Sequence, residues 1–170
     1  MADSRRKAVN PAIWIIIGIA VGICIKLFII DFLRISGTSM EPEIHNGSTI
    51  LVNKLAYGLV KPGSRIFFVQ WSEPQAGDVV IYLHDNKIVI KRCAAVSGTH
   101  LDYSSDSGYS LHVGAADITL TKEQYELMHT SSFVPAGYIL AIGDNYADSI
   151  DSRSYGFVSV KNVVGRVIGK

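Results

Sequence analysis

The longest apolar stretch of the chain lies near its start. Residues 12–30 carry a single charged side chain, Lys26. A helix of this length rises about 28 Å, close to the ~30 Å hydrocarbon core of a bilayer. The Lys26 stem can reach the outer headgroups, with Asp31 just beyond it, so the pattern predicts a transmembrane anchor, which we assign to residues 12–33.

A cleaved secretory signal is the alternative interpretation of this stretch, because Arg5, Arg6 and Lys7 precede it. The apolar run is longer than the usual signal core of about 7–15 residues, and residues 31–36 hold no small-x-small cleavage site. An anchor is therefore favoured. The basic residues before it predict a cytoplasmic tail over 1–11 and an extracytoplasmic domain over 34–170.

After the anchor, apolar residues occur in short runs rich in β-branched side chains, and Gly, Pro, Asn and Asp separate the runs. This pattern is typical of a mostly antiparallel β domain. The expected strands are residues 48–52, 65–69, 78–82, 87–91, 138–142 and 162–168.

One helix is expected over residues 121–129, because Thr121 and Gln124 have the spacing of a capping box. Residues 98–118 are polar and rich in Gly and Ser. We assign residues 98–135 to an insertion on the β core that contains this helix.

Composition narrows the possible functions. The chain has 170 residues, 16 Lys and Arg against 15 Asp and Glu, and a net charge of +1, which argues against a nucleic-acid partner. Cys24 and Cys93 are too few for a disulfide scaffold or a four-cysteine zinc site, and the five histidines lack metal-motif spacing. We therefore expect no metal and no cofactor.

Three segments are unusual for a plain β domain. Ser39 lies in a turn of small residues that could present a nucleophile, although such turns are common. Lys91 shares a strand face with Val89 and Cys93, so it is either a desolvated lysine with a lowered pKa or an ordinary lysine whose ammonium reaches water. Residues 143–157 are dense in short polar side chains, and within them Asp151 and Arg153 could form an ion pair.

Taken in order, these motifs resemble the bacterial type I signal peptidases, and the match covers the anchor and nearly all of the β core. The motifs are Ser39-Met40-Glu41-Pro42, Gly77-Asp78-Val79-Val80, Lys91-Arg92, Gly143-Asp144-Asn145 and Asp151-Ser152-Arg153 with Gly156-Phe157.

The resemblance implies a membrane-bound serine endopeptidase of the plasma (inner) membrane. It would remove signal peptides from translocated preproteins after small residues of the Ala-x-Ala type. Ser39 would be the nucleophile and Lys91, as a neutral amine, the general base, which agrees with the need of a serine hydroxyl for a nearby base. The partners would be preprotein signal peptides and the lipid bilayer.

The resemblance also implies supporting roles. Ser149 would orient the lysine, while Gly143, Asp151 and Arg153 would hold the turn around it. The walls of a cleft for an extended substrate would be formed by Ile35, Ser36, Met40, Ile44, Val89 and Ile90. The sequence departs from the family at Gly37, where some members have a serine that helps to bind the oxyanion.

Other interpretations remain at this stage. A specialised relative that matures pilin-like or conjugation proteins, or a mitochondrial inner-membrane version, would share these motifs. A non-enzymatic membrane-anchored β domain would have a Lys91 of ordinary titration. A self-cleaving repressor-type protease is excluded, because its Ala-Gly cleavage site would precede the serine, whereas Ala76-Gly77 and Ala136-Gly137 follow Ser39.

Overall fold

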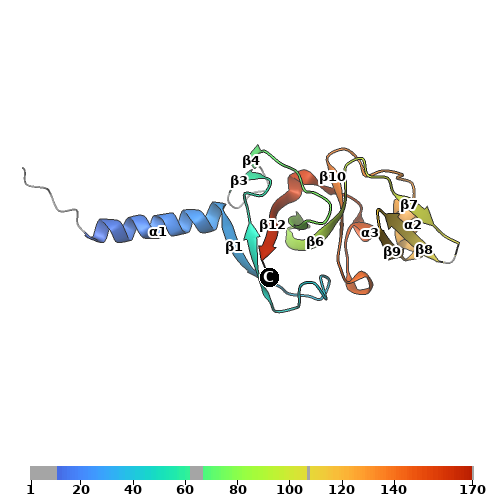
Figure 1. The fold of residues 1–170 in the computed structure, drawn as a ribbon, viewed down its shortest axis with the longest axis horizontal. Coiled ribbons are helices and arrows are strands. Elements are labelled where there is room, and N and C mark those ends of the chain that lie inside the picture. Colours follow the sequence, from blue (N-terminus) through green and yellow to red (C-terminus); the bar gives the residue numbers. More distant parts are fainter. Residues whose placement is uncertain (1–10, 62–66, 107, 170) are drawn as a thin grey trace, which may run out of the picture.

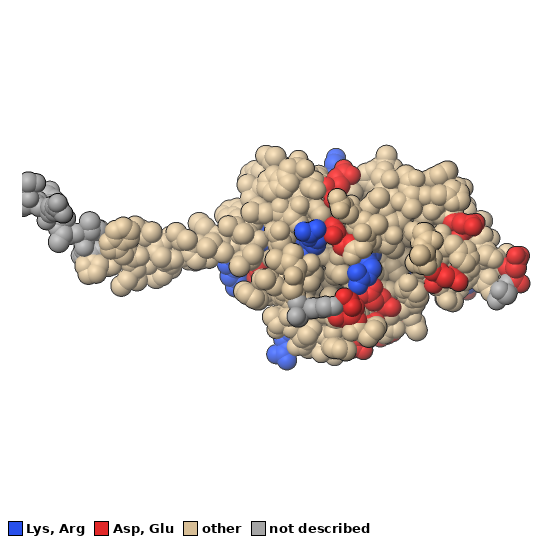
Figure 2. Space-filling model, viewed as in Figure 1, with Lys and Arg blue, Asp and Glu red and all other residues tan. Residues whose placement is uncertain are grey.

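A single helix projects from a folded β domain in the computed structural model, which describes residues 11–61, 67–106 and 108–169. Helix α1 spans Pro11–Phe28, with a mean hydropathy of 2.3 and no buried residue. No charged side chain is visible along its projecting part (Figure 2). Length and composition therefore suit a membrane span. The expected cytoplasmic tail lies almost wholly outside the described residues.

The helix is shorter than the expected anchor of residues 12–33. Residues beyond Ile29 leave the helix and form strand β1 (Ile30–Arg34), which pairs with β2 (Thr49–Asn53). The Lys54 ammonium stabilises this junction, because it donates to the Lys26 carbonyl at 3.0 Å and lies 2.9 Å from Asp31. A cation at the last turn satisfies free carbonyls of the helix end.

Seven strands form one antiparallel sheet in the order β1-β2-β12-β5-β6-β10-β11 (Figure 1). The mostly β, antiparallel fold class is thus confirmed. Besides β1 and β2, this sheet contains β5 (Val79–His84), β6 (Lys87–Val96), β10 (Tyr138–Ile142), β11 (Val158–Ser159) and β12 (Val163–Gly169).

The β5–β6 hairpin aligns two central strands of the sheet. Asp85 and Asn86 both have positive φ, 47° and 62°, as a two-residue turn of the favoured hairpin type requires. The resulting register sets Lys91 opposite Val80. A small hairpin of β3 (Gly58–Val60) and β4 (Phe67–Gln70) lies beside the sheet as a separate pair.

All six expected strands exist, with shifts of one or two residues at most ends. The exception is β6, which continues to Val96 rather than ending at Lys91. Residues 65–66 of one expected strand lie outside the described residues, and β4 begins at Phe67. Within β10, Ile139 and Ala141 enter one core while Leu140 and Ile142 enter another, so both faces of this strand are buried.

The insertion is more ordered than its polar composition indicated. It contains strands β7 (Asp102–Ser104), β8 (Tyr109–Val113) and β9 (Ala116–Leu120), followed by α2 (Lys122–Met128). The capping box of Thr121 and Gln124 is present, which confirms the expected helix. Alternate apolar residues of this unit pack against β10, at the end of the domain away from α1 (Figure 1).

The remaining elements follow β10. They are the one-turn helix α3 (Ser152–Tyr155) and two 3₁₀ turns, Tyr146–Asp148 and Val160–Asn162. The segment between β10 and α3 is the polar cluster singled out in the sequence. Cys93 is buried and unpaired, as expected for a small apolar side chain in the core.

Candidate active site

Two residues 52 positions apart in the sequence meet at the surface of the sheet. Nζ of Lys91 lies 2.6 Å from Oγ of Ser39, within hydrogen-bond distance. Lys91 comes from strand β6, and Ser39 lies in the turn that follows β1. The register of β6 and the position of this turn therefore bring together the two residues that the sequence singled out.

The surroundings of Lys91 disfavour its charged form. The residue is only 4% exposed, and this burial lowers the pKa of Lys91 from its usual value of 10.5. The carboxylate of Asp151 acts in the opposite direction, whereas the guanidinium of Arg153 lowers the pKa further. Desolvation is the largest of these effects, so the geometry favours a neutral amine beside Ser39.

Apolar packing attaches the Ser39 turn to the core. Met40 and Ile44 are buried in one core cluster with Ile35 and Ile50, and the Ile44 amide donates to the Met40 carbonyl at 2.8 Å. The turn is thus attached to the sheet by residues on both sides of the serine.

The segment after β10 holds the same turn through hydrogen bonds. The backbone amide of Asn145 donates to the Ser39 carbonyl at 3.1 Å, and the Asn145 side chain donates to the Thr38 carbonyl at 3.2 Å. The Thr38 hydroxyl donates to Asp148. These hydrogen bonds fix the Ser39 turn relative to the segment after β10.

A buried ion pair organises that second segment and confirms the pairing expected of Asp151 and Arg153. The two side chains are 0% and 1% exposed and meet at 2.9 Å. Asp151 also accepts from the Ser149 hydroxyl at 2.6 Å and the Gly143 amide at 3.0 Å. Burial alone would raise the pKa of Asp151, but hydrogen bonds from Arg153, Ser149 and Gly143 outweigh it and lower the pKa.

The sequence assigned Ser149 the task of orienting Lys91. Its hydroxyl here donates to Asp151, and Ser149 borders the same groove as Lys91. The orienting role that the resemblance implies for Ser149 stays a prediction.

Position 143 has no room for a side chain. A Cβ atom at this position would lie 2.2 Å from Oγ of Ser149 and 2.5 Å from the carbonyl oxygen of Ser39. Real Cβ atoms essentially never approach other atoms below 3.0 Å. Glycine therefore lets the segment after β10 lie directly against the Ser39 turn.

Arg92 and Asp144 lie in the sequence motifs, but the sequence predicted no role for them. Their side chains form a two-point ion pair, with contacts of 2.8 and 2.7 Å, and Arg92 also donates to the Gly77 carbonyl. This pair ties β6, next to Lys91, to the segment that carries Asn145. The sequence signals for this pair were that Arg92 follows Lys91 and that Asp144 follows Gly143.

A groove of about 740 Å³ runs past Ser39 and Lys91. Five of the six residues predicted to form its walls do line it. Ile44 does not line it, and its side chain is buried in the same core cluster as those of Ile35 and Met40. The predicted residues that line the groove are Ile35, Ser36, Met40, Val89 and Ile90.

Along the groove, β6 has an edge that the described strands leave open. Its residues Arg92–Val96 pair with β10 on one side, whereas Lys87–Lys91 pair with β5 alone among the described strands. An extended peptide could add to such an edge through backbone hydrogen bonds. Gly37 borders the groove too, and its amide donates to the Asn46 side chain at 3.1 Å.

Comparison with known proteins agrees with this geometry. The family described as "Signal peptidase, peptidase S26" matches residues 6–169. A signal peptidase I of Bacillus caldolyticus is 28% identical over 182 residues, 98% of this chain and 92% of the relative. A signal peptidase IB of Staphylococcus aureus is 30% identical over 175 residues, covering 89% and 85%.

A thylakoidal processing peptidase of Arabidopsis thaliana is 29% identical over 136 residues, 79% of this chain and 39% of its own length. Among solved structures, a signal peptidase I of Enterococcus faecalis has a TM-score of 0.42 and 22% identity, over 57% of this chain and 98% of that one. The family match spans the helix, the sheet and the groove, and the chain belongs to the signal peptidase family of serine peptidases, peptidase S26.

Proposed function

We propose that the protein is a membrane-bound endopeptidase that removes signal peptides from translocated preproteins after small residues, with Ser39 as nucleophile and Lys91 as general base. The observation that carries this proposal is the 2.6 Å separation between Ser39 Oγ and the nitrogen of a buried lysine. A non-enzymatic domain has no need to keep an amine desolvated beside a serine hydroxyl.

The reaction follows from this pair. Neutral Lys91 takes the Ser39 hydroxyl proton as Oγ attacks the substrate carbonyl, and the resulting ammonium gives that proton to the leaving amine. Water then attacks the acyl-enzyme, with Lys91 again accepting a proton, and Ser39 is regenerated. No metal or cofactor takes part in these steps.

Charge on the substrate oxygen needs a donor in the transition state. We assign the backbone N–H of Ser39 to this role. The other two groups nearby are engaged elsewhere, because the Gly37 amide donates to Asn46 and the Thr38 hydroxyl donates to Asp148. The carbonyl of Ser39 is fixed by Asn145, which holds its turn in place.

Substrate selection follows from the groove. An extended segment before the scissile bond would pair with the open edge of β6, and its side chains would meet Ile35, Val89 and Ile90. Shallow apolar walls accept alanine and exclude larger side chains, because overpacking such a pocket is unfavourable. This supports cleavage at Ala-x-Ala sites.

Location follows from the short distance along the chain between α1 and the nucleophile. Ser39 lies eleven residues beyond Phe28, the last residue of the apolar helix. With the basic N-terminal residues in the cytoplasm, the site lies at the outer face of the membrane, where translocated precursors emerge while still anchored. Protease added to spheroplasts should digest the β domain, and protection of that domain would reverse this orientation.

The proposed function is tested by cleavage of a precursor with an Ala-x-Ala site in detergent. Ser39→Ala and Lys91→Ala should each lower kcat by about 10³-fold or more, and the double variant should be no worse than either one, since the pair acts as a unit. Substantial activity of Lys91→Ala would remove the lysine as the base.

A further inference from the structure

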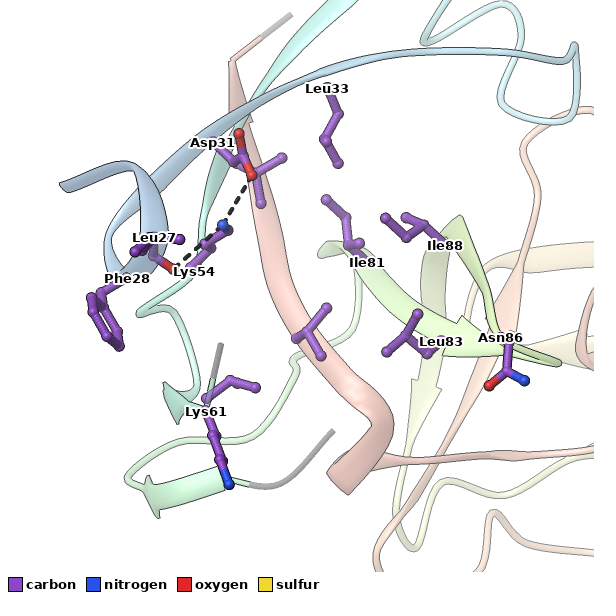
Figure 3. A pocket seen from close by; sticks show the side chains of 13 residues that line it. Leu27, Phe28, Asp31, Leu33, Lys54, Lys61, Ile81, Leu83, Asn86 and Ile88 are labelled. Carbon is purple, nitrogen blue, oxygen red and sulfur yellow. Dashed lines mark hydrogen bonds and ion pairs between the residues drawn. The ribbon is translucent and has the colours of Figure 1, made fainter. Parts of the chain in front are cut away.

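A second cavity lies between the end of α1 and the sheet. Its volume is about 450 Å³, within the range of about 300–1,000 Å³ that is usual for ligand sites. Figure 3 shows Leu27 and Phe28 on the helix side and Ile81, Leu83 and Ile88 on the sheet side. The walls are mainly apolar, and the site residues of the proposed reaction lie outside them.

Two of the three charged side chains at this cavity pair with each other, and the third is Lys61. Lys54 and Asp31 lie 2.9 Å apart, and Lys54 also donates to the carbonyl of Leu27 at 3.5 Å (Figure 3). These contacts fix the end of α1 against β2, so the cavity has a defined shape. The pairing leaves a mainly apolar space with Lys61 at its rim, which suits a mainly apolar occupant.

The cavity adjoins the catalytic groove, so an extended chain could continue from one into the other. Leu33 and Ile88 line both spaces, with Leu33 on β1 and Ile88 on β6. A chain leaving Ser39 along the groove towards α1 therefore passes between these two residues into the cavity. Ile88 is 59% exposed, so its side chain is available to an occupant.

Strand geometry sets the scale of this path. Residues rise about 3.3 Å each along a strand, so Ile88 lies about 10 Å before Lys91 on β6. A substrate extended along this edge would bring the third residue before the scissile bond beside Ile88. The next residues upstream would then enter the cavity.

The direction of the substrate follows from the membrane. The apolar segment of a signal peptide precedes its cleavage site and lies in the bilayer, and α1 ends beside the cavity. Residues upstream of the scissile bond must therefore approach Ser39 from the α1 side. From this adjacency and direction, and resting on the proposed function, we propose that the cavity binds the last apolar residues of the signal peptide, at positions about four to seven before the scissile bond.

Binding here would make recognition depend on an apolar segment placed at a set distance from the cleavage site. A precursor would gain affinity from burial of one or two apolar side chains beyond the groove. A short peptide that ends three residues before the scissile bond would cleave without this gain. The cavity would therefore distinguish signal peptides from other exposed Ala-x-Ala sequences.

The test compares two substrates in detergent: a precursor with its full signal peptide, and a short peptide that spans only the three residues before the scissile bond and those after it. The variant is Leu83→Ser, because Leu83 lines the cavity but not the groove. Leu83→Trp is the second variant, to be used if Leu83→Ser does not fold, because its large aromatic ring would fill the cavity. Leu127→Ser, at a 51% exposed leucine of α2, is the matched control.

We expect each Leu83 variant to lower kcat/KM for the precursor about tenfold, through burial lost at one apolar contact, and to leave the short peptide within about twofold of wild type. The control should change neither. An equal loss on both substrates, or no loss on either, would overturn the cavity as a signal-peptide site. Failure of the wild-type enzyme to cleave either substrate would instead refute the proposed function.

A photoreactive apolar side chain six residues before the scissile bond provides a second measurement, in Ser39→Ala enzyme that holds the precursor uncleaved. Cross-links to Leu83 or to Val60, which also lines the cavity, support the proposal. Cross-links confined to lipid in vesicles would mean that an acyl chain occupies the cavity, and would overturn it.

Discussion

Gly143→Ala is the smallest change that tests how the two halves of the site fit together. The new methyl carbon would start 2.2 Å from Oγ of Ser149 and 2.5 Å from the carbonyl oxygen of Ser39. Ordinary van der Waals contact begins at 3.4 Å, so these atoms must separate by 1.2 and 0.9 Å. One of the two neighbours is backbone, which cannot rotate away.

The displacement falls on the turn that carries Ser39, the proposed nucleophile. A misplacement of about 1 Å at a reacting group costs about 10²-fold in rate, and overpacking costs about 1–3 kcal/mol of stability. We therefore expect Gly143→Ala to lower kcat about 10²-fold while the protein still folds. The assay is cleavage of a short Ala-x-Ala peptide at saturating substrate, with urea unfolding measured on the same preparation.

Gly165→Ala is the control, because its Cβ would meet Val52 and Asn53 at 3.0 and 3.1 Å in the sheet. That variant should lose some stability and keep its kcat for the short peptide. The reasoning would be refuted if folded Gly143→Ala cleaved the peptide within threefold of wild type, or if both variants lost activity in proportion to stability.

Further predictions concern the charges of the site. The kcat/KM of cleavage should rise with pH through an apparent pKa below the 10.5 of an ordinary lysine, because only neutral Lys91 accepts the proton; a limb that vanished on changing a histidine would refute this base. The lowered pKa means that, between that pKa and 10.5, the unfolded chain binds more protons than the folded one, so stability rises with pH. Lys91→Met should therefore have a higher Tm than wild type at pH 7, with the difference shrinking towards pH 10.5, and a constant difference would contradict desolvation as the cause. Asp151→Asn should cost about 3–5 kcal/mol in urea unfolding, because Arg153 is left as a buried charge. Glu126→Gln, in an exposed pair with Lys122, should cost under about 0.5 kcal/mol, and equal costs for the two variants would count against the buried pair as a structural element.

Much of the architecture follows from local pattern. The apolar run before residue 30 predicts a helix long enough to span a membrane, and the structure has α1 there. Runs of β-branched residues located all six expected strands, because strand propensity and turn residues act over a few neighbouring positions. The strands of the insertion were not predicted, although Leu111 and Ile118 belong to short runs in which apolar and polar residues alternate. The surrounding polar, Gly- and Ser-rich composition favoured a loop instead.

Helix α1 ends before the predicted anchor does, for a related reason. Ile30, Phe32 and Leu33 are apolar although Asp31 lies among them, so local composition does not end the helix before residue 33. Pairing of β1 with β2, and the contacts of Lys54 with Asp31 and the helix end, end it earlier. Those partners are far away in the sequence.

The sequence by itself predicted which residues would carry the reaction, because Ser39, Lys91 and the Asp151–Arg153 pair lie in ordered motifs that resemble a known family. Only the tertiary structure decided that Lys91 is buried beside Ser39, that Gly143 leaves room for that contact, and that Ile44 lies in the core rather than in the groove. The physical reason is that desolvation and close approach depend on segments brought together from distant parts of the chain. Local pattern specifies the elements, and packing between them sets the pKa, the distances and the shape of the groove.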